Sequence, residues 1–310
     1  MQIIYQSEIN SFTPCVATVG FFDGVHAGHR FLIEELKNLA TTQHLKSVVV
    51  TFRNHPRKVL HSDFQPQLIT TLKEKLEQLE TTGIDTCIVL DFSLEMAKLS
   101  AYEFLKTILS EQFNVKTLLV GHDHRFGHNR ADGFSEYKQY GILLGMEVIK
   151  ANRFSTDSET KISSSTIRDA LNTGNIELAN KLLTYNYSIM GKVINGFKVG
   201  QKIGFPTANI EILESEKLVP AIGVYAVKFR WNKRKFNGMM NIGKRPTLDN
   251  GKNISIEVNI FDFSDNIYNE TVEIDFITKI RDEIKFNNID ELIEQLKKDK
   301  IEVLNYLNRE

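Results

Sequence analysis

Two histidines, His26 and His29, follow a glycine-rich turn in the segment GFFDGVHAGH, residues 20–29. An apolar run typical of a strand precedes this turn, and an amphipathic pattern typical of a helix follows it. A helix N-terminus attracts phosphate because its first N–H groups are unpaired and carry a partial positive charge. Imidazoles at positions i and i+3 can lie on one side of a helix and donate hydrogen bonds. The segment therefore predicts a site that stabilises negative charge on a transferred phosphate.

A second segment whose residues could bind a ligand is GFKVGQKIGFPTANI, residues 196–210. Its glycines allow a loop to fold over phosphates, and Thr207 and Asn209 offer hard oxygen donors that suit Mg²⁺. The spacing is not that of a Walker motif, because no Gly-Lys-Ser/Thr occurs. Further along, Glu257 lies between apolar residues that share one face of a strand, so its carboxylate points to the other face. Taken alone, such a carboxylate is more often merely solvated.

Two different domain types must position these residues. Up to about residue 183, short continuous apolar runs alternate with helical patterns, which predicts a doubly wound parallel sheet of the α/β class. The expected strands are 16–21, 47–52, 86–90, 117–120 and 147–149, and the expected helices are 30–42, 72–81, 101–112 and 134–140. Ligands in such sheets bind beyond the carboxyl ends of the strands, where residues 20–29 and 121–127 fall.

From residue 187 the pattern changes to alternation with period two, separated by glycine or asparagine turns. This predicts an antiparallel sheet closed into a barrel, and the amphipathic segment 289–307 predicts a C-terminal helix. We therefore expect two domains, residues 1–185 and 186–310. A length of 310 residues suits two domains better than one.

The composition narrows the class of protein. The hydrophobic content is 42%, the charged content 25% and the net charge −1, so no basic surplus points to nucleic acid. The two cysteines, Cys15 and Cys87, lie in apolar contexts and are expected to be buried thiols in a reducing compartment. No apolar run approaches the roughly 20 residues that cross a bilayer, and the N-terminus does not resemble a signal peptide. We expect a soluble cytoplasmic protein.

The complete string G-x-F-D-G-x-H-x-G-H resembles the signature of the nucleotidyltransferase superfamily. In this full form it is similar to the adenylyltransferase half of bacterial bifunctional riboflavin kinase/FAD synthetases. Three later segments follow in the family's order: TFRNHP at 51–56, VGHDHRFGHNRADG at 120–133 and ISSSTIR at 162–168. His124 stands where the family usually has phenylalanine, and Ser165 where it usually has threonine, so the hydroxyl is kept.

The C-terminal half resembles the kinase of the same family. GFPTAN, residues 204–209, is similar to the nucleotide and metal site of riboflavin kinases, and Glu257 stands where they place the catalytic glutamate. Residues 241–247 and 280–286 resemble segments near the flavin. The resemblance covers essentially the whole chain. It implies a Rossmann-like nucleotidyltransferase domain followed by a six-stranded antiparallel barrel.

The resemblance also implies roles for individual residues. The implied catalytic residues are Glu257 in the kinase and His26, His29 and Arg168 in the adenylyltransferase. In the adenylyltransferase, ATP or phosphate binding is implied for Gly20, Phe21, Asp23, Gly24, Gly28, Ser163, Ser164 and Ser165, and flavin binding for Asp123 and Phe126. In the kinase, ATP binding is implied for Gly196, Gly200, Lys202, Gly204, Thr207 and Asn209, flavin binding for Asn241, Gly243 and Arg281, and Mg²⁺ binding for Thr207 and Asn209.

Two successive reactions follow from the resemblance. The barrel would transfer the γ-phosphoryl group of ATP to riboflavin, and the N-terminal domain would then transfer AMP from a second ATP to FMN. Mg²⁺ is expected at both sites, ATP and flavins are the expected substrates, and FMN, FAD, ADP and pyrophosphate the products. We expect no nucleic acid, no membrane and no obligate protein partner.

Several alternatives remain beside this interpretation. A histidine near a helix start is usually a cap or a surface residue, and His-x-x-His is half of a zinc site, although no further ligand follows at suitable spacing. His122, His124 and His128 also invite a metal interpretation, over which we favour a polar variant of a flavin-contacting loop. The other functional candidates are a single nucleotidyltransferase with a structural barrel, a tRNA-related protein and a flavin sensor without activity.

Overall fold

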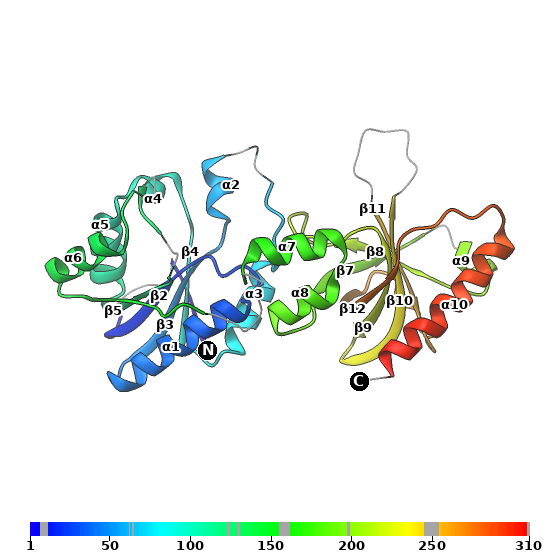
Figure 1. Ribbon diagram of the computed structural model, residues 1–310, viewed down its shortest axis with the longest axis horizontal. Helices are drawn as coiled ribbons and strands as arrows, with labels where there is room; N and C mark the ends of the chain where they lie inside the picture. Colours follow the sequence, from blue (N-terminus) through cyan, green and yellow to red (C-terminus); the bar gives the residue numbers. More distant parts are fainter. Residues whose placement is uncertain are drawn as a thin grey trace. The chain divides into compact units, whose positions relative to one another are not determined.

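The computed structural model describes residues 1–6, 12–61, 63, 65–122, 125–128, 131–154, 162–196, 199–244 and 254–308. By its internal contacts the chain divides into two compact units, Met1–Ser163 and Ser164–Glu310. Each unit has its own sheet (Figure 1). Among the described residues, no helix is long and apolar enough to span a membrane.

The first unit is built on a parallel sheet of six strands in the order β1-β4-β3-β2-β5-β6. The strands are β1 (Gln2–Tyr5), β2 (Cys15–Val19), β3 (Lys46–Phe52), β4 (Thr86–Leu90), β5 (Val115–Val120) and β6 (Glu147–Lys150). Every residue of β2 and β4 is buried, because helices cover both faces of the sheet (Figure 1). The strand order reverses at β2, so the predicted doubly wound sheet is confirmed and β2 adjoins its switch point.

Helices on the two faces of this sheet enclose two separate apolar cores. The helices are α1 (Ala27–Thr42), α2 (Pro56–Leu60), α3 (Leu72–Glu80), α4 (Leu94–Lys98), α5 (Ala101–Glu103), the π-helix η2 (Phe104–Gln112) and α6 (Phe134–Leu144). One core joins Ile33 and Leu36 of α1 to Leu79 of α3, and includes the buried Cys87. The other joins the π-helix to α6 and includes the buried Cys15. Both thiols are therefore buried, as predicted.

The second unit contains a closed barrel of six strands in the order β10-β11-β8-β7-β12-β9, which confirms the predicted barrel. Its strands are β7 (Ser188–Ile194), β8 (Ala208–Ile212), β9 (Gly223–Trp231), β10 (Arg234–Lys244), β11 (Ile254–Ile260) and β12 (Thr271–Arg281). The short helix α9 (Val199–Lys202) precedes β8. The C-terminal helix α10 (Ile289–Leu307) packs along the barrel (Figure 1), where Val303 and Leu307 contact a core shared with Val224 and Met239.

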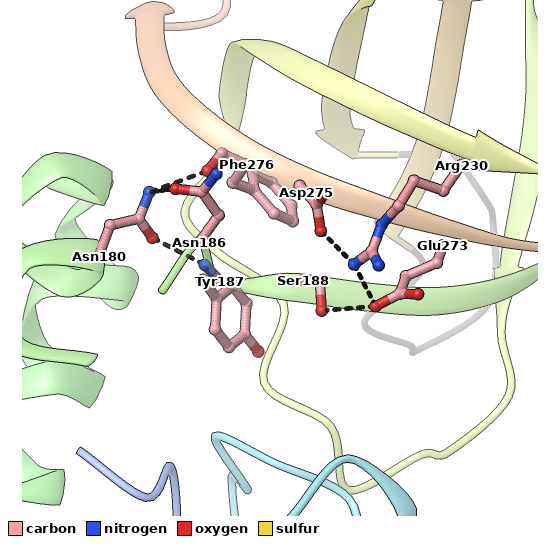
Figure 2. A network of polar contacts seen from close by, with 8 residues as sticks. All are labelled: Asn180, Asn186, Tyr187, Ser188, Arg230, Glu273, Asp275 and Phe276. Atoms are coloured by element: carbon pink, nitrogen blue, oxygen red, sulfur yellow. Dashed lines mark hydrogen bonds and ion pairs between the residues drawn. The ribbon is translucent and has the colours of Figure 1, made fainter. Parts of the chain in front are cut away.

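Two helices before the barrel belong to the same compact unit, α7 (Ser164–Thr173) and α8 (Ile176–Leu183). Figure 2 shows how α8 is attached: Asn180 donates to the Phe276 carbonyl of β12 at 2.9 Å and accepts from the Tyr187 amide at 2.8 Å. The Ala221 amide also donates to the Leu171 carbonyl of α7 at 3.0 Å. The division by contacts thus falls earlier in the chain than the functional boundary between residues 185 and 186, which stays a prediction.

Beside this attachment, an ionic network connects neighbouring strands of the barrel (Figure 2). Arg230 of β9 forms ion pairs with Glu273 and Asp275 of β12, and Ser188 of β7 donates to Glu273 at 3.2 Å. Burial raises the pKa of Asp275 above its ordinary value, although Arg230 acts in the opposite direction. The network links three adjacent strands and so contributes to holding the barrel closed.

Candidate functional sites

The predicted phosphate turn follows the end of β2 and contains three residues in the left-handed region, Phe22 (φ +54°), Gly24 (φ +82°) and Val25 (φ +37°). Such conformations are costly for phenylalanine and valine, and they persist where surrounding contacts enforce them. Strained backbone of this kind concentrates at functional sites. The turn therefore has the character expected of a ligand-binding loop.

Asp23 anchors this turn from the inside. Its side chain is 3% exposed, and its carboxylate accepts from the amides of Ile69 and Thr70 at 3.2 and 3.0 Å and from the Thr70 hydroxyl at 3.2 Å. The Gly24 amide in turn donates to the Thr70 hydroxyl at 2.9 Å. The carboxylate thus ties the turn to the segment before α3, and the predicted contact of Asp23 with a nucleotide stays a prediction.

The two predicted histidines lie together at the start of α1. His26 is the N-cap, and its Nδ1 accepts from the His29 amide at 3.4 Å. The two rings stack with centroids 3.7 Å apart and an angle of 16° between their planes. Because Nδ1 of His26 is an acceptor, this hydrogen bond assigns the proton of the neutral ring to Nε2. The pair therefore combines imidazole donors with the amides of a helix N-terminus, as the phosphate site requires.

Glycine and phenylalanine residues shape the space around the histidines. A Cβ on Gly28 would lie 3.4 Å from the His26 ring, and a Cβ on Gly20 would lie 2.9 Å from the Phe22 ring. The Phe22 ring meets His29 edge-on at 5.1 Å, and the Phe21 ring meets His55 edge-on at 4.8 Å. The structure thus places Gly20, Phe21, Gly24 and Gly28 in or beside the turn, while their contacts with ATP stay predictions.

The predicted flavin loop is described only in part, because Asp123 and His124 lie outside the described residues. Phe126 stacks on Tyr137 of α6 at 4.2 Å, and the Tyr137 hydroxyl donates to the Phe126 carbonyl at 3.0 Å. Nδ1 of His128 lies 3.2 Å from the Ala97 carbonyl. In the part of the chain that the structure describes, no three candidate ligands gather as a metal site. That part does not include His124, so the metal interpretation is untested.

The ISSSTIR segment begins α7. Ser164, Ser165 and Arg168 lie in its first two turns, directly after Ser163. By contacts, α7 belongs to the second unit and the histidine pair to the first. The roles of these four residues in adenylyl transfer therefore stay predictions.

In the barrel, the predicted kinase residues come together. The Thr207 hydroxyl donates to Oε2 of Glu257 at 3.2 Å. Glu257 of β11 is paired in register with Asn209 of β8 and with Asn241 of β10, and directly paired residues project to the same face of a sheet. A hydroxyl, a carboxylate and two carboxamides thus form one polar group across three strands.

Glycines allow close approach to this polar group, defined by Thr207, Asn209, Asn241 and Glu257. A Cβ on Gly196 would lie 2.0 Å from Nδ2 of Asn209, and a Cβ on Gly200 would lie 2.2 Å from the Phe205 carbonyl and 3.4 Å from the Thr207 hydroxyl. A Cβ on Gly243 would lie 3.1 Å from Nδ2 of Asn241. Only glycine fits these positions without displacing neighbours. The side chain of Lys202 lies outside the described residues.

A pocket of about 440 Å³ lies between the segment that precedes β8, the end of β11 and α10. It is lined by residues 204–206, residues 259–263, Lys297 and Lys300. Asn259 donates to the Pro206 carbonyl at 2.7 Å, which joins the two segments of the wall, and Lys300 lies 5.0 Å from the centroid of the Phe261 ring. Sequence reasoning found Gly204 but missed the two lysines. The available signal was their spacing of three residues, which places both lysines on one side of the C-terminal helix.

Arg281 has a structural partner. Its Nε lies 3.0 Å from both carboxylate oxygens of Asp299 and its Nη2 lies 2.7 Å from one of them, while Nη1 donates to the Asp282 carbonyl at 2.9 Å. Asp299 of α10 is 1% exposed. The guanidinium therefore fastens α10 to the end of β12, and the predicted contact of Arg281 with flavin stays a prediction.

Replacing Arg281 by methionine should lower the free energy of unfolding of the barrel by about 3–5 kcal/mol, because it leaves the buried Asp299 charge without its partner. The double variant Arg281→Met/Asp299→Leu should recover much of this loss. Trp231 is the single tryptophan and lies in β9, so its fluorescence during urea unfolding reports on the barrel. Arg234→Met, which breaks an exposed ion pair with Asp265, is the matched control and should change little.

Comparison with known proteins places both halves of the chain. Residues 8–166 match the family model of FAD synthetases, and residues 183–307 match that of riboflavin kinases. Two proteins named bifunctional riboflavin kinase/FMN adenylyltransferase are similar over most of the chain. The one from Haemophilus influenzae is 40% identical over 92% of each chain, and the one from Bacillus subtilis is 39% identical over 94% of this chain and 92% of the relative.

A solved structure supports the fold over the whole length. The crystal structure described as a macrolide-efflux protein from Streptococcus pneumoniae has a TM-score of 0.90 and 34% sequence identity. The alignment covers 99% of this chain and 100% of that chain. Both family models and the relatives that are similar over most of the chain agree. The chain therefore belongs to the family of bifunctional riboflavin kinase/FMN adenylyltransferases.

Proposed function

We propose that the kinase reaction of this bifunctional enzyme takes place in the barrel, at Glu257, and adenylyl transfer in the N-terminal domain, at His26 and His29. The first reaction converts riboflavin and ATP to FMN and ADP, and the second converts FMN and ATP to FAD and pyrophosphate. The contact between Thr207 and Glu257, inside a polar group lined by glycines, carries this proposal. The enzyme acts on small molecules in the cytoplasm. It needs no obligate protein partner and binds neither a membrane nor a nucleic acid.

In the kinase, Glu257 is the general base. Its carboxylate accepts the proton of the ribityl 5′-hydroxyl as that oxygen attacks the γ-phosphorus of ATP. The bond from the Thr207 hydroxyl orients the carboxylate before the substrate arrives. Asn241, which is paired with Glu257 on the neighbouring strand, and Gly243 are assigned to the flavin on the resemblance of their segment.

The donor set of the barrel site fits Mg²⁺. Thr207 supplies a hydroxyl oxygen and Asn209 a carboxamide oxygen, next to the Glu257 carboxylate, and hard oxygen ligands of this kind are those that Mg²⁺ prefers. Bound there, the ion would neutralise charge on the β- and γ-phosphates. Gly196 and Gly200 leave room for the phosphates, and the pocket beside Pro206 accommodates the nucleoside of ATP against Phe261.

In the N-terminal domain, the nucleophile needs no strong base, since the phosphate of FMN is already ionised at neutral pH. Nε2 of His26 and the His29 ring donate to the α-phosphate and to the departing pyrophosphate, together with the amides at the start of α1. Arg168 and the serines at 163–165 are assigned to the same transfer on the resemblance of their segment alone. Asp123 and Phe126 are assigned to the flavin on the same basis.

The test is incubation of the purified chain with riboflavin, ATP and Mg²⁺, followed by chromatography of the flavins. FMN should form first and FAD afterwards, and both reactions should stop when EDTA removes the metal ion. A chain that folds but produces neither FMN nor FAD would contradict the proposed function. Activity that persists unchanged in EDTA would contradict only the assignment of Mg²⁺.

A further inference from the structure

Lys75 of α3 is an almost fully buried cation at the carboxyl ends of two strands. Only 2% of its surface is exposed. Its ammonium group donates to the Phe21 carbonyl at 3.1 Å and to the Phe52 carbonyl at 2.8 Å. The same nitrogen lies 4.1 Å from the centroid of the Phe21 ring. Acceptors and an aromatic face thus replace the water that the ammonium loses on burial.

These contacts bear on the phosphate turn, because Phe21 lies directly before it. Phe21 is the last residue before the strained turn, which begins with Phe22 at φ +54°. Its carbonyl receives a second hydrogen bond from the Thr51 hydroxyl at 3.1 Å. Asp23, two residues later, is fixed by the amides that immediately precede α3. The start of the turn is therefore held by α3 and its leading segment at two points, one of which is Lys75.

We propose that Lys75 is a positioning residue for adenylyl transfer, because it holds the Phe21 carbonyl and thereby sets the turn that directs His26 and His29 toward the transferred phosphate. Lys75 acts through the backbone and does not touch the substrate. The inference rests on the proposed adenylyl transfer at the histidine pair. It adds a residue that lies 46 positions beyond His29 in the sequence and within none of the resembling segments.

The first test replaces Lys75 by methionine, which keeps the length of the side chain but removes both donors. The kcat for conversion of FMN to FAD should fall by about tenfold to a hundredfold, the penalty of misplacing reacting groups by about 1 Å. The kcat for FMN formation by the same preparation should stay unchanged, which shows that the barrel is folded, and the far-UV circular dichroism spectrum should match that of the unaltered chain, which shows that the unit containing Lys75 is folded as well. The matched control is Lys73→Met on the same helix, whose side chain is 67% exposed and which should leave both activities as they are.

The second test uses pH. Burial lowers the pKa of Lys75 from 10.5 to about 8, although Asp23 and Cys87 act in the opposite direction. In the part of the chain that the structure describes, Asp23 and Cys87 act on the ammonium and His55 contacts the ring of Phe21. The neutral amine still has two N–H donors, but its bonds to the Phe21 and Phe52 carbonyls lose their charge assistance and the cation over the Phe21 ring is lost, so FAD synthesis by the unaltered chain should fall as the pH rises through about 8. In Lys75→Arg the guanidinium keeps its charge, so the fall should disappear.

Unfolding does not explain such a fall. Between a pH of about 8 and 10.5 the unfolded chain holds the Lys75 proton more tightly than the folded chain. The contribution of Lys75 to the free energy of unfolding therefore rises with pH in this range. A drop in FAD synthesis without a drop in stability, removed by arginine, is a signature that a purely structural lysine would not produce.

The outcomes distinguish a failure of the proposed adenylyl transfer from a failure of the proposed role of Lys75. If the unaltered chain makes no FAD from FMN, the proposed adenylyl transfer fails. If it makes FAD and Lys75→Met does so at the same rate, only the role of Lys75 is overturned. Should Lys75→Met not fold, the pH profiles of the unaltered chain and of Lys75→Arg decide. The proposal is overturned if FAD synthesis by the unaltered chain stays level as the pH passes about 8. It is also overturned if FAD synthesis by Lys75→Arg falls in the same way.

Discussion

Replacing Glu257 by glutamine should lower the rate of FMN formation by at least about a hundredfold, the typical contribution of a positioned general base. Glutamine has nearly the same shape and keeps an oxygen for the Thr207 hydroxyl, so the contact at 3.2 Å can survive. It cannot accept the proton of the attacking hydroxyl. The measurement is the rate of FMN production from riboflavin, with the conversion of added FMN to FAD followed in the same preparation.

The conversion of FMN to FAD should continue at the normal rate in Glu257→Gln, because the histidine pair lies in the other unit. The matched control is Glu211→Gln. Glu211 is an exposed carboxylate on β8, two residues after Asn209, and its replacement should leave both activities unchanged. Normal FMN formation by Glu257→Gln would remove Glu257 from the mechanism and with it the main support for the barrel as the kinase site.

Replacing His29 by alanine should have the reverse effect. Loss of one preorganised donor to a developing negative charge costs about a hundredfold to a thousandfold in kcat, so FAD formation should almost stop while FMN accumulates. The His29 amide that donates to His26 is retained in alanine, so the cap of α1 is preserved. The measurement is pyrophosphate release with FMN and ATP as substrates.

His61→Ala is the control for this prediction. His61 is exposed and caps the C-terminal end of α2 through its backbone amide, which alanine keeps. Both activities of this variant should match those of the unaltered chain. If instead His29→Ala slowed FMN and FAD formation alike in a folded protein, the model of two separate sites would be wrong.

The sequence predicted both folds because periodicity is a local property. Continuous apolar runs in β2 to β5 reflect burial on two faces, and alternation in β7 and β12 reflects burial on one. The strand β1 was not predicted, since it is a short edge strand with a half-exposed pattern that carries little signal. The expected helix 101–112 is interrupted, as three helical residues pass into the π-helix η2. No local sequence pattern predicted the change from α-helical to π-helical hydrogen bonding.

Within the sites, residue type and order predicted the groups that meet, such as Thr207 with Glu257. They did not predict which polar residues support them. The partners of the Asp23 carboxylate lie 46 and 47 positions away, and Lys75 in a helical pattern reads as an ordinary solvent-facing residue. Such pairings depend on how helices dock onto the sheet, which the periodicity of one segment does not contain.

The attachment of α7 and α8 to the barrel has a practical meaning for anyone who wishes to separate the two activities into two polypeptides. A cut that follows the motifs, between residues 185 and 186, would leave the ISSSTIR helix with the adenylyltransferase. It would also remove Asn180 from Phe276 and Tyr187 and uncover the apolar side of α8, including Leu182 and Leu183. A cut that follows the packing, after Ser163, would keep the barrel whole but take Arg168 with it. If Arg168 serves adenylyl transfer as proposed, neither cut keeps both the proposed residues of each reaction and the packing of α7 and α8, so separating the activities should cost one of them.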